Sequence, residues 1–255
     1  GGVMSREYVV WDLGGTKCAA AVVVVDGSSY TVKNTAVALL SHFSSLDEMA
    51  LELHQTMAVD PSQVDGICIG AAGSYDGSEL QLASGYPFRM CFSEVAKLQS
   101  WSDFSVVHDY TPVVASTFTY NGNHPAVHVI RQGVLNPCGR RIALGLGTGL
   151  GVKDAICTTE GEYWYGQNEL GHIGLTRPPL TDQMHLTWYD DFLSFLTQHP
   201  VAQLAPLTFE TVLSGAGFAL IYQFVTGSFE SLTPRQTQQA IDEDLTVKNQ
   251  VLSLL

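Results

Sequence analysis

Two glycine-rich turns constrain the fold of this chain more than any other feature. Each follows an apolar run, residues 8–11 or residues 142–144, that reads as a strand. Glycines after a strand let the backbone approach an anion closely, with N–H groups free to point at it. A single turn of this kind is more often a hairpin, but two of them, each with a threonine, favour a nucleotide held at both ends of its triphosphate. The turns are Asp12-Leu13-Gly14-Gly15-Thr16-Lys17 and Gly145-Leu146-Gly147-Thr148-Gly149-Leu150-Gly151.

The composition excludes several classes of partner. The chain has 255 residues, 45% of them hydrophobic, which suits a globular protein with a sizeable core. Its formal net charge of -13 argues against a nucleic-acid backbone or an anionic membrane as partner. The five cysteines include no Cys-x-x-Cys pair, as expected for free thiols in a reducing compartment. No signal peptide is visible and the longest apolar run, 18–25, is too short to span a bilayer, so we expect a cytoplasmic protein.

The order of strands and helices predicts an α/β fold. A unit of three strands, a helix and a further strand is repeated loosely after residue 110, which predicts a small domain over 1–110 and a large one over 111–255, with a cleft between them. Hydrophobic periodicity and turn residues define these elements. The expected strands are 8–11, 18–25, 30–38, 64–69, 104–107, 141–146 and 152–157, and the expected helices begin at Ser45 and span 111–120, 185–198, 217–226 and 236–255.

Three acidic residues and a histidine are candidates for chemistry. Asp109 follows a strand, where it could accept a proton from a hydroxyl nucleophile or simply cap the next helix. Glu169 and His172 share a glycine-rich loop that could grip the hydroxyls of a polyol, contribute two ligands to a metal, or be ordinary surface. Glu210 begins a short helix, where acids are common for dipole reasons, and the turn 214–217 after it could direct N–H groups at a ligand.

Read in order, these segments resemble bacterial glucokinase, the hexokinase-type sugar kinase of the actin-like ATPase superfamily. The resemblance covers nearly the whole chain. Together, the motifs indicate this family far more specifically than any one of them does alone. The cysteine-rich zinc motif of the repressor-type sugar kinases is absent. The matching segments are the two glycine turns, His108-Asp109-Tyr110-Thr111, Glu169-Leu170-Gly171-His172, and Glu210 with Leu213-Ser214-Gly215-Ala216-Gly217.

The resemblance implies a two-domain actin-like ATPase (ribonuclease H-like) fold that phosphorylates glucose to glucose 6-phosphate with ATP and Mg²⁺. Asp109 would be the catalytic base on the sugar 6-hydroxyl, and Asp12 would face Mg²⁺ through water. A homodimer is also implied. The implied sugar-binding residues are His108, Asp109, Glu169, His172 and Glu210, and the implied nucleotide-binding residues are Asp12, Gly14, Gly15, Thr16, Lys17, Gly147, Thr148 and Gly149.

Two departures from the family pattern bear on function. The family has Asn-Asp where this chain has His108-Asp109, which we expect to alter sugar preference or pH dependence. The family also continues past the last helix into a further glycine-rich turn at the adenosine, so we expect the large domain to be incomplete at its C-terminal end. Two rival functions remain open: a catalytically silent sugar-binding protein of the same fold, and an actin-like ATPase that acts on no sugar.

Overall fold

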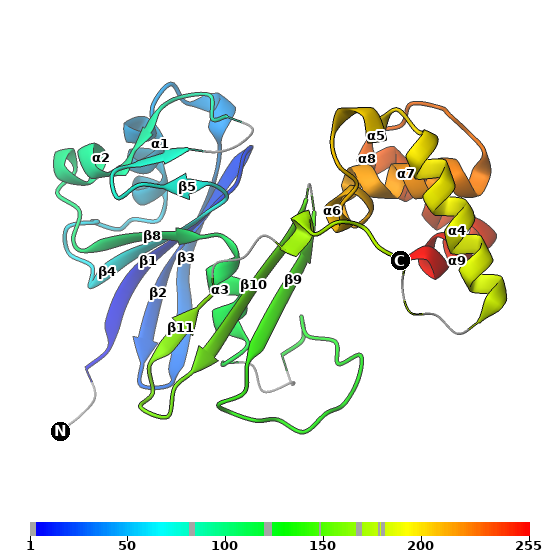
Figure 1. Ribbon diagram of the computed structural model, residues 1–255. Helices are drawn as coiled ribbons and strands as arrows, with labels where there is room; N and C mark the ends of the chain where they lie inside the picture. Colours follow the sequence, from blue (N-terminus) through cyan, green and yellow to red (C-terminus); the bar gives the residue numbers. More distant parts are fainter. Residues whose placement is uncertain are drawn as a thin grey trace. The chain divides into compact units, whose positions relative to one another are not determined.

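The chain divides after His128 into two units that each contain a β-sheet. The computed structural model describes residues 4–81, 85–119, 124–147, 149–166, 170–177, 179 and 182–255, and these form α/β structure (Figure 1). Helix α3 (Tyr110–Ser116), which the sequence placed at the start of the second domain, belongs to the first unit.

The first unit is built on a five-stranded sheet of order β3-β2-β1-β4-β8. Strands β1 to β3 form an antiparallel meander, while β4 pairs parallel with β1 and β8 pairs parallel with β4. Parallel neighbours need crossover connections, and α1 and α2 lie in the two that this sheet requires. The strands are β1 (Arg6–Leu13), β2 (Lys17–Asp26), β3 (Ser29–Leu39), β4 (Gly66–Ala71) and β8 (Phe104–His108), and the crossover helices are α1 (Leu46–Thr56) and α2 (Phe92–Leu98).

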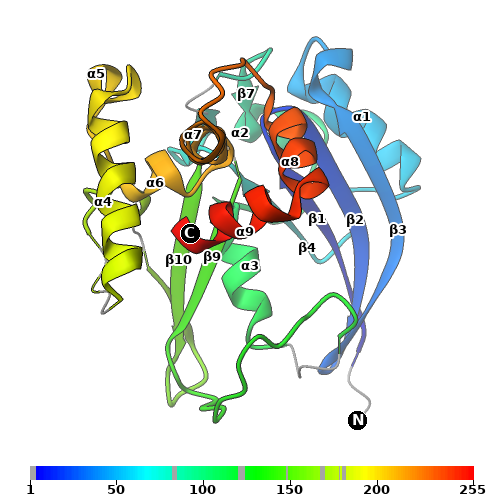
Figure 2. The same cartoon turned by 90° about the vertical axis from the view of Figure 1, so that its right-hand side faces the viewer.

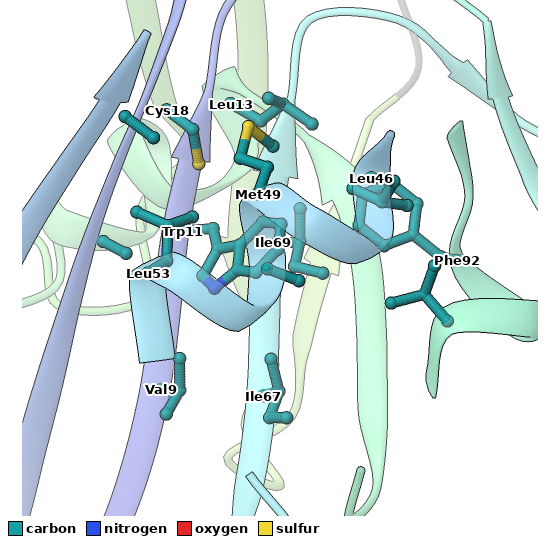
Figure 3. Close-up of a cluster of buried hydrophobic side chains, with 14 of the residues drawn as sticks. Val9, Trp11, Leu13, Cys18, Leu46, Met49, Leu53, Ile67, Ile69 and Phe92 are labelled. Atoms are coloured by element: carbon teal, nitrogen blue, oxygen red, sulfur yellow. The ribbon is translucent and has the colours of Figure 1, made fainter. Parts of the chain in front are cut away.

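The core of this unit lies between one face of the sheet and α1. Side chains alternate along a strand, so Val9, Trp11 and Leu13 of β1 all point to the same buried face. Met49 and Leu53 of α1 pack onto that face (Figure 3). Ser45 caps α1, as the sequence predicts. The Ser45 hydroxyl accepts a hydrogen bond from the Glu48 amide.

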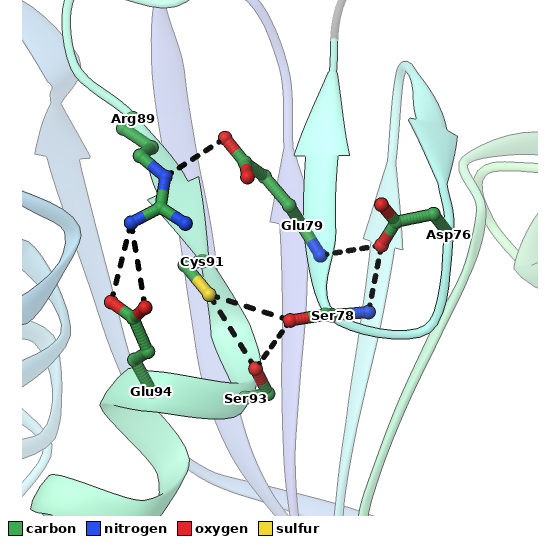
Figure 4. A network of polar contacts seen from close by, with 7 residues as sticks. All are labelled: Asp76, Ser78, Glu79, Arg89, Cys91, Ser93 and Glu94. Atoms are coloured by element: carbon green, nitrogen blue, oxygen red, sulfur yellow. Dashed lines mark hydrogen bonds and ion pairs between the residues drawn. The ribbon is translucent and has the colours of Figure 1, made fainter.

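Several short elements of the first unit were not expected from the sequence. They are η1 (Leu40–His42), β5 (Ser74–Tyr75), β6 (Glu79–Gln81), β7 (Met90–Cys91) and α2. Polar contacts bind the small sheet β5-β6-β7 to α2: Arg89 pairs with Glu79 at 3.1 Å and with Glu94 at 3.4 Å, and the Ser78 hydroxyl contacts both Cys91 and Ser93 (Figure 4). Strands of two or three residues are too short to carry a hydrophobic period, so only these tertiary contacts define them.

The second unit combines a three-stranded antiparallel sheet, β11-β10-β9, with a helical cluster. Phe192, Leu196 and Ile221 are buried at the centre of the helices, which Figure 2 shows as α4 to α9. Its elements are β9 (Arg141–Leu146), β10 (Leu150–Cys157), β11 (Tyr163–Tyr165), η2 (Leu170–His172), α4 (Gln183–Gln198), α5 (Val201–Leu204), α6 (Phe209–Val212), α7 (Gly215–Thr226), α8 (Pro234–Glu243) and α9 (Leu245–Leu254).

The single helix expected over 236–255 is wrong. Asp244 interrupts it with an extended backbone (φ -125°, ψ 102°) and accepts hydrogen bonds from the amides of Thr246 and Val247. Aspartate is a strong N-cap because its carboxylate satisfies amides that a helix start leaves unpaired. Because the apolar periodicity continues across Asp244, the sequence pattern did not indicate that the helix breaks there. Across the described parts of both units, no helix has the length and apolar character to cross a membrane.

His54 of α1 is a polar residue inside the first core. Its side chain is 2% exposed, and Nε2 accepts a hydrogen bond of 3.3 Å from the Trp11 indole, whose ring also packs edge-on against Trp101. Nδ1 therefore carries the imidazole hydrogen, and it is buried without a partner. Burial lowers the pKa of His54 from 6.5 to about 4, because the core disfavours the imidazolium.

We expect the first unit to lose stability as the pH falls from about 6.5 to about 4. Between these two pH values His54 is protonated in the unfolded chain but stays neutral in the folded core, so the free energy of unfolding decreases. Above this range His54 is neutral in both states, and below it the decrease is complete. The shift corresponds to about 3 kcal/mol. Urea unfolding followed by tryptophan fluorescence should show this loss in the wild type. His54→Phe should show a smaller loss over the same range, and an identical loss in the two proteins would contradict the assignment.

Candidate active site

The first glycine turn joins β1 to β2 as a tight hairpin. The Gly14 amide donates 2.9 Å to the Lys17 carbonyl, and the Thr16 carbonyl accepts from the Leu40 amide at 2.9 Å. The amide of Gly14 is therefore used inside the turn, contrary to the expectation that all the turn amides are free. Gly15 and Thr16 are exposed, and within the described residues their amides have no hydrogen-bond partner. These two N–H groups are the ones that an anion could reach.

Asp12 and Asp109 lie at the same edge of the first sheet. Asp12 is near the carboxyl end of β1, where it is in register with Gly70 of β4, and Asp109 follows directly after β8. Because β1, β4 and β8 run parallel, their carboxyl ends meet at one edge, which is where α/β sheets bind ligands. Asp12 is exposed. Its negative charge adds to burial in raising the pKa of the Cys18 thiol.

Asp109 occupies the N-cap position of α3 but does not cap it. The backbone there is helical (φ -60°, ψ -25°), and its carboxylate makes no capping hydrogen bond, so the purely structural interpretation of this residue is wrong. The Asp109 amide is held by the Ala71 carbonyl at 3.0 Å. A side chain at Gly70 would meet the ring of Pro112 at 3.2 Å, so glycine there lets α3 approach the sheet. The fold thus positions the Asp109 carboxylate, which makes no capping hydrogen bond to α3.

Tyr86 is a buried residue on which the charge of Asp109 acts. Burial, followed by the charge of Asp109, raises the pKa of the Tyr86 phenol to about 12. Its hydroxyl is buried without a hydrogen-bond partner in the described part of the chain. The segment before β7 has no periodicity or motif that would have singled it out. An unpaired buried hydroxyl beside a carboxylate is a feature that only tertiary structure reveals.

The second glycine turn, between β9 and β10, is tied to the helices of its unit. The Gly147 amide donates to the Gly149 carbonyl at 3.0 Å, and the Gly147 carbonyl accepts 2.8 Å from the Gly215 amide at the start of α7. The amide of Gly147 is therefore also used internally. Ser214 caps α7 by accepting from the Gly217 amide. The expected turn at 214–217 thus serves the helix and holds the glycine turn.

Glu210 joins three segments of the second unit. Its Oε2 accepts 3.0 Å from the Leu150 amide, and its Oε1 lies 3.7 Å from Nε2 of His172 in η2. A side chain at Gly149 would come within 2.6 Å of Oε2, and one at Gly171 within 3.5 Å. Gly149 therefore makes room for the carboxylate, whereas a side chain at Gly171 would first meet the Leu150 carbonyl at 2.8 Å. His172 and Glu210, expected to act together, are brought together, with side chains 61% and 37% exposed.

Other predicted site residues can be placed only in part. Thr148 and Glu169 lie outside the described residues. Lys17 begins β2 and is exposed beside the first glycine turn. Among the described residues, no cluster of three or more His, Cys, Asp or Glu side chains could hold a metal ion by itself. The cavity of about 200 Å³ lined by Arg89, Cys91 and Glu94 contains none of the predicted site residues.

Comparison with known proteins identifies the family. The glucokinase family model matches residues 9–254 of the chain. The chain belongs to the glucokinase family. Among curated glucokinases, that of Saccharophagus degradans is 24% identical over 220 residues, covering 85% of this chain and 62% of the relative. That of an Enterobacter strain is 25% identical over 262 residues, covering 98% and 74%. The chain thus spans only part of the length of the glucokinases that it matches.

Solved structures of this family share the fold. A glucokinase from an Antarctic psychrotroph matches with a TM-score of 0.75 and 19% identity over 96% of this chain and 74% of that one. The glucokinase of Balamuthia mandrillaris, solved with glucose, matches with a TM-score of 0.66 and 17% identity over 97% and 72%. At these identities the likeness concerns the fold alone, which is the actin-like ATPase fold that the sequence predicted.

Gly149→Ala should displace the Glu210 carboxylate, because the added methyl would lie 2.6 Å from Oε2. The Leu150 amide would then lose its acceptor. Hydrogen exchange at Leu150 should accelerate about tenfold, which corresponds to one hydrogen bond of about 1.4 kcal/mol. Gly147→Ala is the matched control, since nothing lies within 4 Å of the added atom. Equal exchange rates in the two variants would show that Gly149 is not required for this contact.

Proposed function

We propose that this chain phosphorylates glucose at its 6-hydroxyl with ATP, with Asp109 as the general base. The observation that carries the proposal is the Asp109 carboxylate, which lies at the ligand-binding edge of the first sheet and makes no cap for its own helix. Membership of the glucokinase family supports the reaction class. The competing interpretation, a silent sugar-binding protein, has no structural feature in its favour.

In the proposed reaction, Asp109 accepts the proton of the 6-hydroxyl as the sugar oxygen attacks the γ-phosphorus. The new O–P bond forms while the bond to the β-phosphate oxygen breaks, and ADP leaves. Phosphoryl transfer requires positioning and charge stabilisation more than covalent help from the protein. A base that is positioned but not hydrogen-bonded within its own helix meets that requirement.

Glu210 and His172 would bind hydroxyl groups of the polyol. Glu210 already orients its carboxylate through the Leu150 amide, which leaves Oε1 facing the His172 ring. A carboxylate and an imidazole together offer acceptors and a donor, which suits adjacent hydroxyl groups. Glu169 and His108 complete the sugar-binding residues in this proposal.

The triphosphate would be held by the two glycine turns. The amides of Gly15 and Thr16, which have no partner among the described residues, suit phosphate oxygens at one end, and Lys17 follows them directly in the sequence. Gly147, Thr148 and Gly149 would face the other end. Asp12 is an exposed single carboxylate, which fits Mg²⁺ held largely through water and phosphate oxygens. When bound, Mg²⁺ would neutralise charge on the phosphates.

We also infer a cytoplasmic location, where ATP and hexoses are available. The free thiols are consistent with it, since all five cysteines are unpaired. A homodimer remains a proposal taken from the family resemblance.

Asp109→Ala should abolish sugar phosphorylation while leaving the fold intact. Loss of a general base lowers kcat by about 10²–10⁴-fold, and no capping hydrogen bond is lost with the carboxylate. The assay is ADP release with ATP, Mg²⁺ and a panel of hexoses, with circular dichroism to confirm folding. Asp191→Ala, at an exposed position on α4, is the control and should retain wild-type turnover.

The outcomes separate the rival functions. Near-normal turnover in Asp109→Ala would remove this residue from the role of base. Glucose binding by calorimetry without any turnover in the wild type would favour the silent sugar-binding protein. ATP hydrolysis that is independent of every sugar would favour an ATPase without a sugar substrate.

A further inference from the structure

His108, the residue before the proposed base, makes two contacts through a single ring nitrogen, Nδ1. His108 Nδ1 accepts a hydrogen bond of 3.3 Å from the Tyr110 amide, and the same Nδ1 lies 3.2 Å from Oδ1 of Asp109. The imidazole also stacks on the Tyr110 ring, with centroids 5.9 Å apart and an interplanar angle of 28°. The ring is therefore held with its Nδ1 edge between an amide donor and a carboxylate acceptor.

These two contacts require opposite states of Nδ1: the first needs its lone pair and the second needs a hydrogen on it. An imidazole nitrogen has either a lone pair or a hydrogen in the ring plane, so it accepts or donates but does not do both. When His108 is neutral, Nδ1 can accept from the Tyr110 amide, and Nε2 carries the hydrogen. When His108 is protonated, Nδ1–H can donate only to Asp109, and the Tyr110 amide loses its partner.

We propose that the proton on His108 controls whether Asp109 is available as a base, an inference that rests on the proposed function. In the neutral state His108 holds the helix start through Tyr110 and leaves the carboxylate to the sugar hydroxyl. In the protonated state a charge-assisted hydrogen bond engages Oδ1 of Asp109. His108 is thus a positioning residue that makes this kinase sensitive to acid. An asparagine at this place, as in the family pattern, could not respond in this way because its amide does not protonate.

Among the described residues, Asp109 is the acidic residue that contacts the His108 imidazole. Asp109 faces it from the position before α3 and Tyr110 from the first position of α3, and the charge of Asp109 also acts on Tyr86, in the segment before β7. On the paired strand β4 the residue in register with His108 is Ala71, which does not titrate. The imidazole side chain is 41% exposed, so it exchanges protons with solvent directly.

His108→Asn is the decisive variant. Its side-chain oxygen can accept from the amide two residues on, as asparagine commonly does, and so replaces the neutral contact without the proton. Between about pH 8 and about pH 5.5, kcat of the wild type should fall about tenfold more than kcat of His108→Asn, with the sugar KM changing less than kcat. The other histidines are present in both proteins, so the difference isolates His108. Superimposable profiles would overturn the proposal.

His124→Asn controls for the loss of a histidine of similar local geometry. His124 Nδ1 likewise accepts a hydrogen bond, of 3.1 Å, from the amide two residues on, at Ala126. Because His124 is not part of the proposed site, this variant should keep the wild-type profile. A change equal to that in His108→Asn would assign the effect to histidine removal in general and overturn the proposal.

A measurement without turnover separates this inference from the proposed function. Over the same pH range, the Tyr110 amide resonance in a ¹H–¹⁵N spectrum should move upfield as the amide loses its acceptor. In His108→Asn it should stay in place. Movement in the wild type with no sugar phosphorylation would sustain the switch and reject the proposed function. A Tyr110 resonance that does not move in the wild type would reject the switch whatever the activity.

Discussion

The pairing of β1 with β2 on one side and with β4 on the other determines where the first set of functional groups lies. It places the first glycine turn, Asp12 and, through the β4–β8 ladder, Asp109 at one edge of the sheet. The register is specified because Val9, Trp11 and Leu13 must all reach the same buried face, and a slip by one residue would turn them to solvent. The apolar core thus fixes the position of polar residues that contribute nothing to it.

In the second unit, the Glu210 carboxylate determines how the neighbouring segments are arranged. The Glu210 carboxylate holds the Leu150 amide and faces His172, and Gly149 lacks the side chain that would displace it. Glycine at position 149 therefore has a role that the motif alone does not suggest, which is to leave space for the Glu210 carboxylate. The first and second turns look alike in sequence, but their glycines meet different neighbours.

Much of the fold was accessible from periodicity and turn chemistry. The long strands β1, β2, β3, β9 and β10 and the Ser45 cap were predicted because each has a local signal, alternation or a capping side chain. Strands β5 to β7 and the break at Asp244 were missed, because short strands depend on their neighbours and a continuous apolar stripe conceals a cap. At the site, the sequence named Asp109, His172 and Glu210, but it could not decide whether Asp109 capped its helix or reveal the buried hydroxyl of Tyr86.

By itself, the sequence determined the α/β class and the glucokinase family, and it predicted which residues bear the chemistry, since each rests on local patterns and on their order along the chain. Only the tertiary structure decided which turn amides are free, that the Asp109 carboxylate makes no cap, and that one nitrogen of His108 stands between an amide and a carboxylate. The reason is physical: a hydrogen bond depends on distance and direction between specific atoms. Those are properties of the folded backbone, and residue identities alone do not specify them.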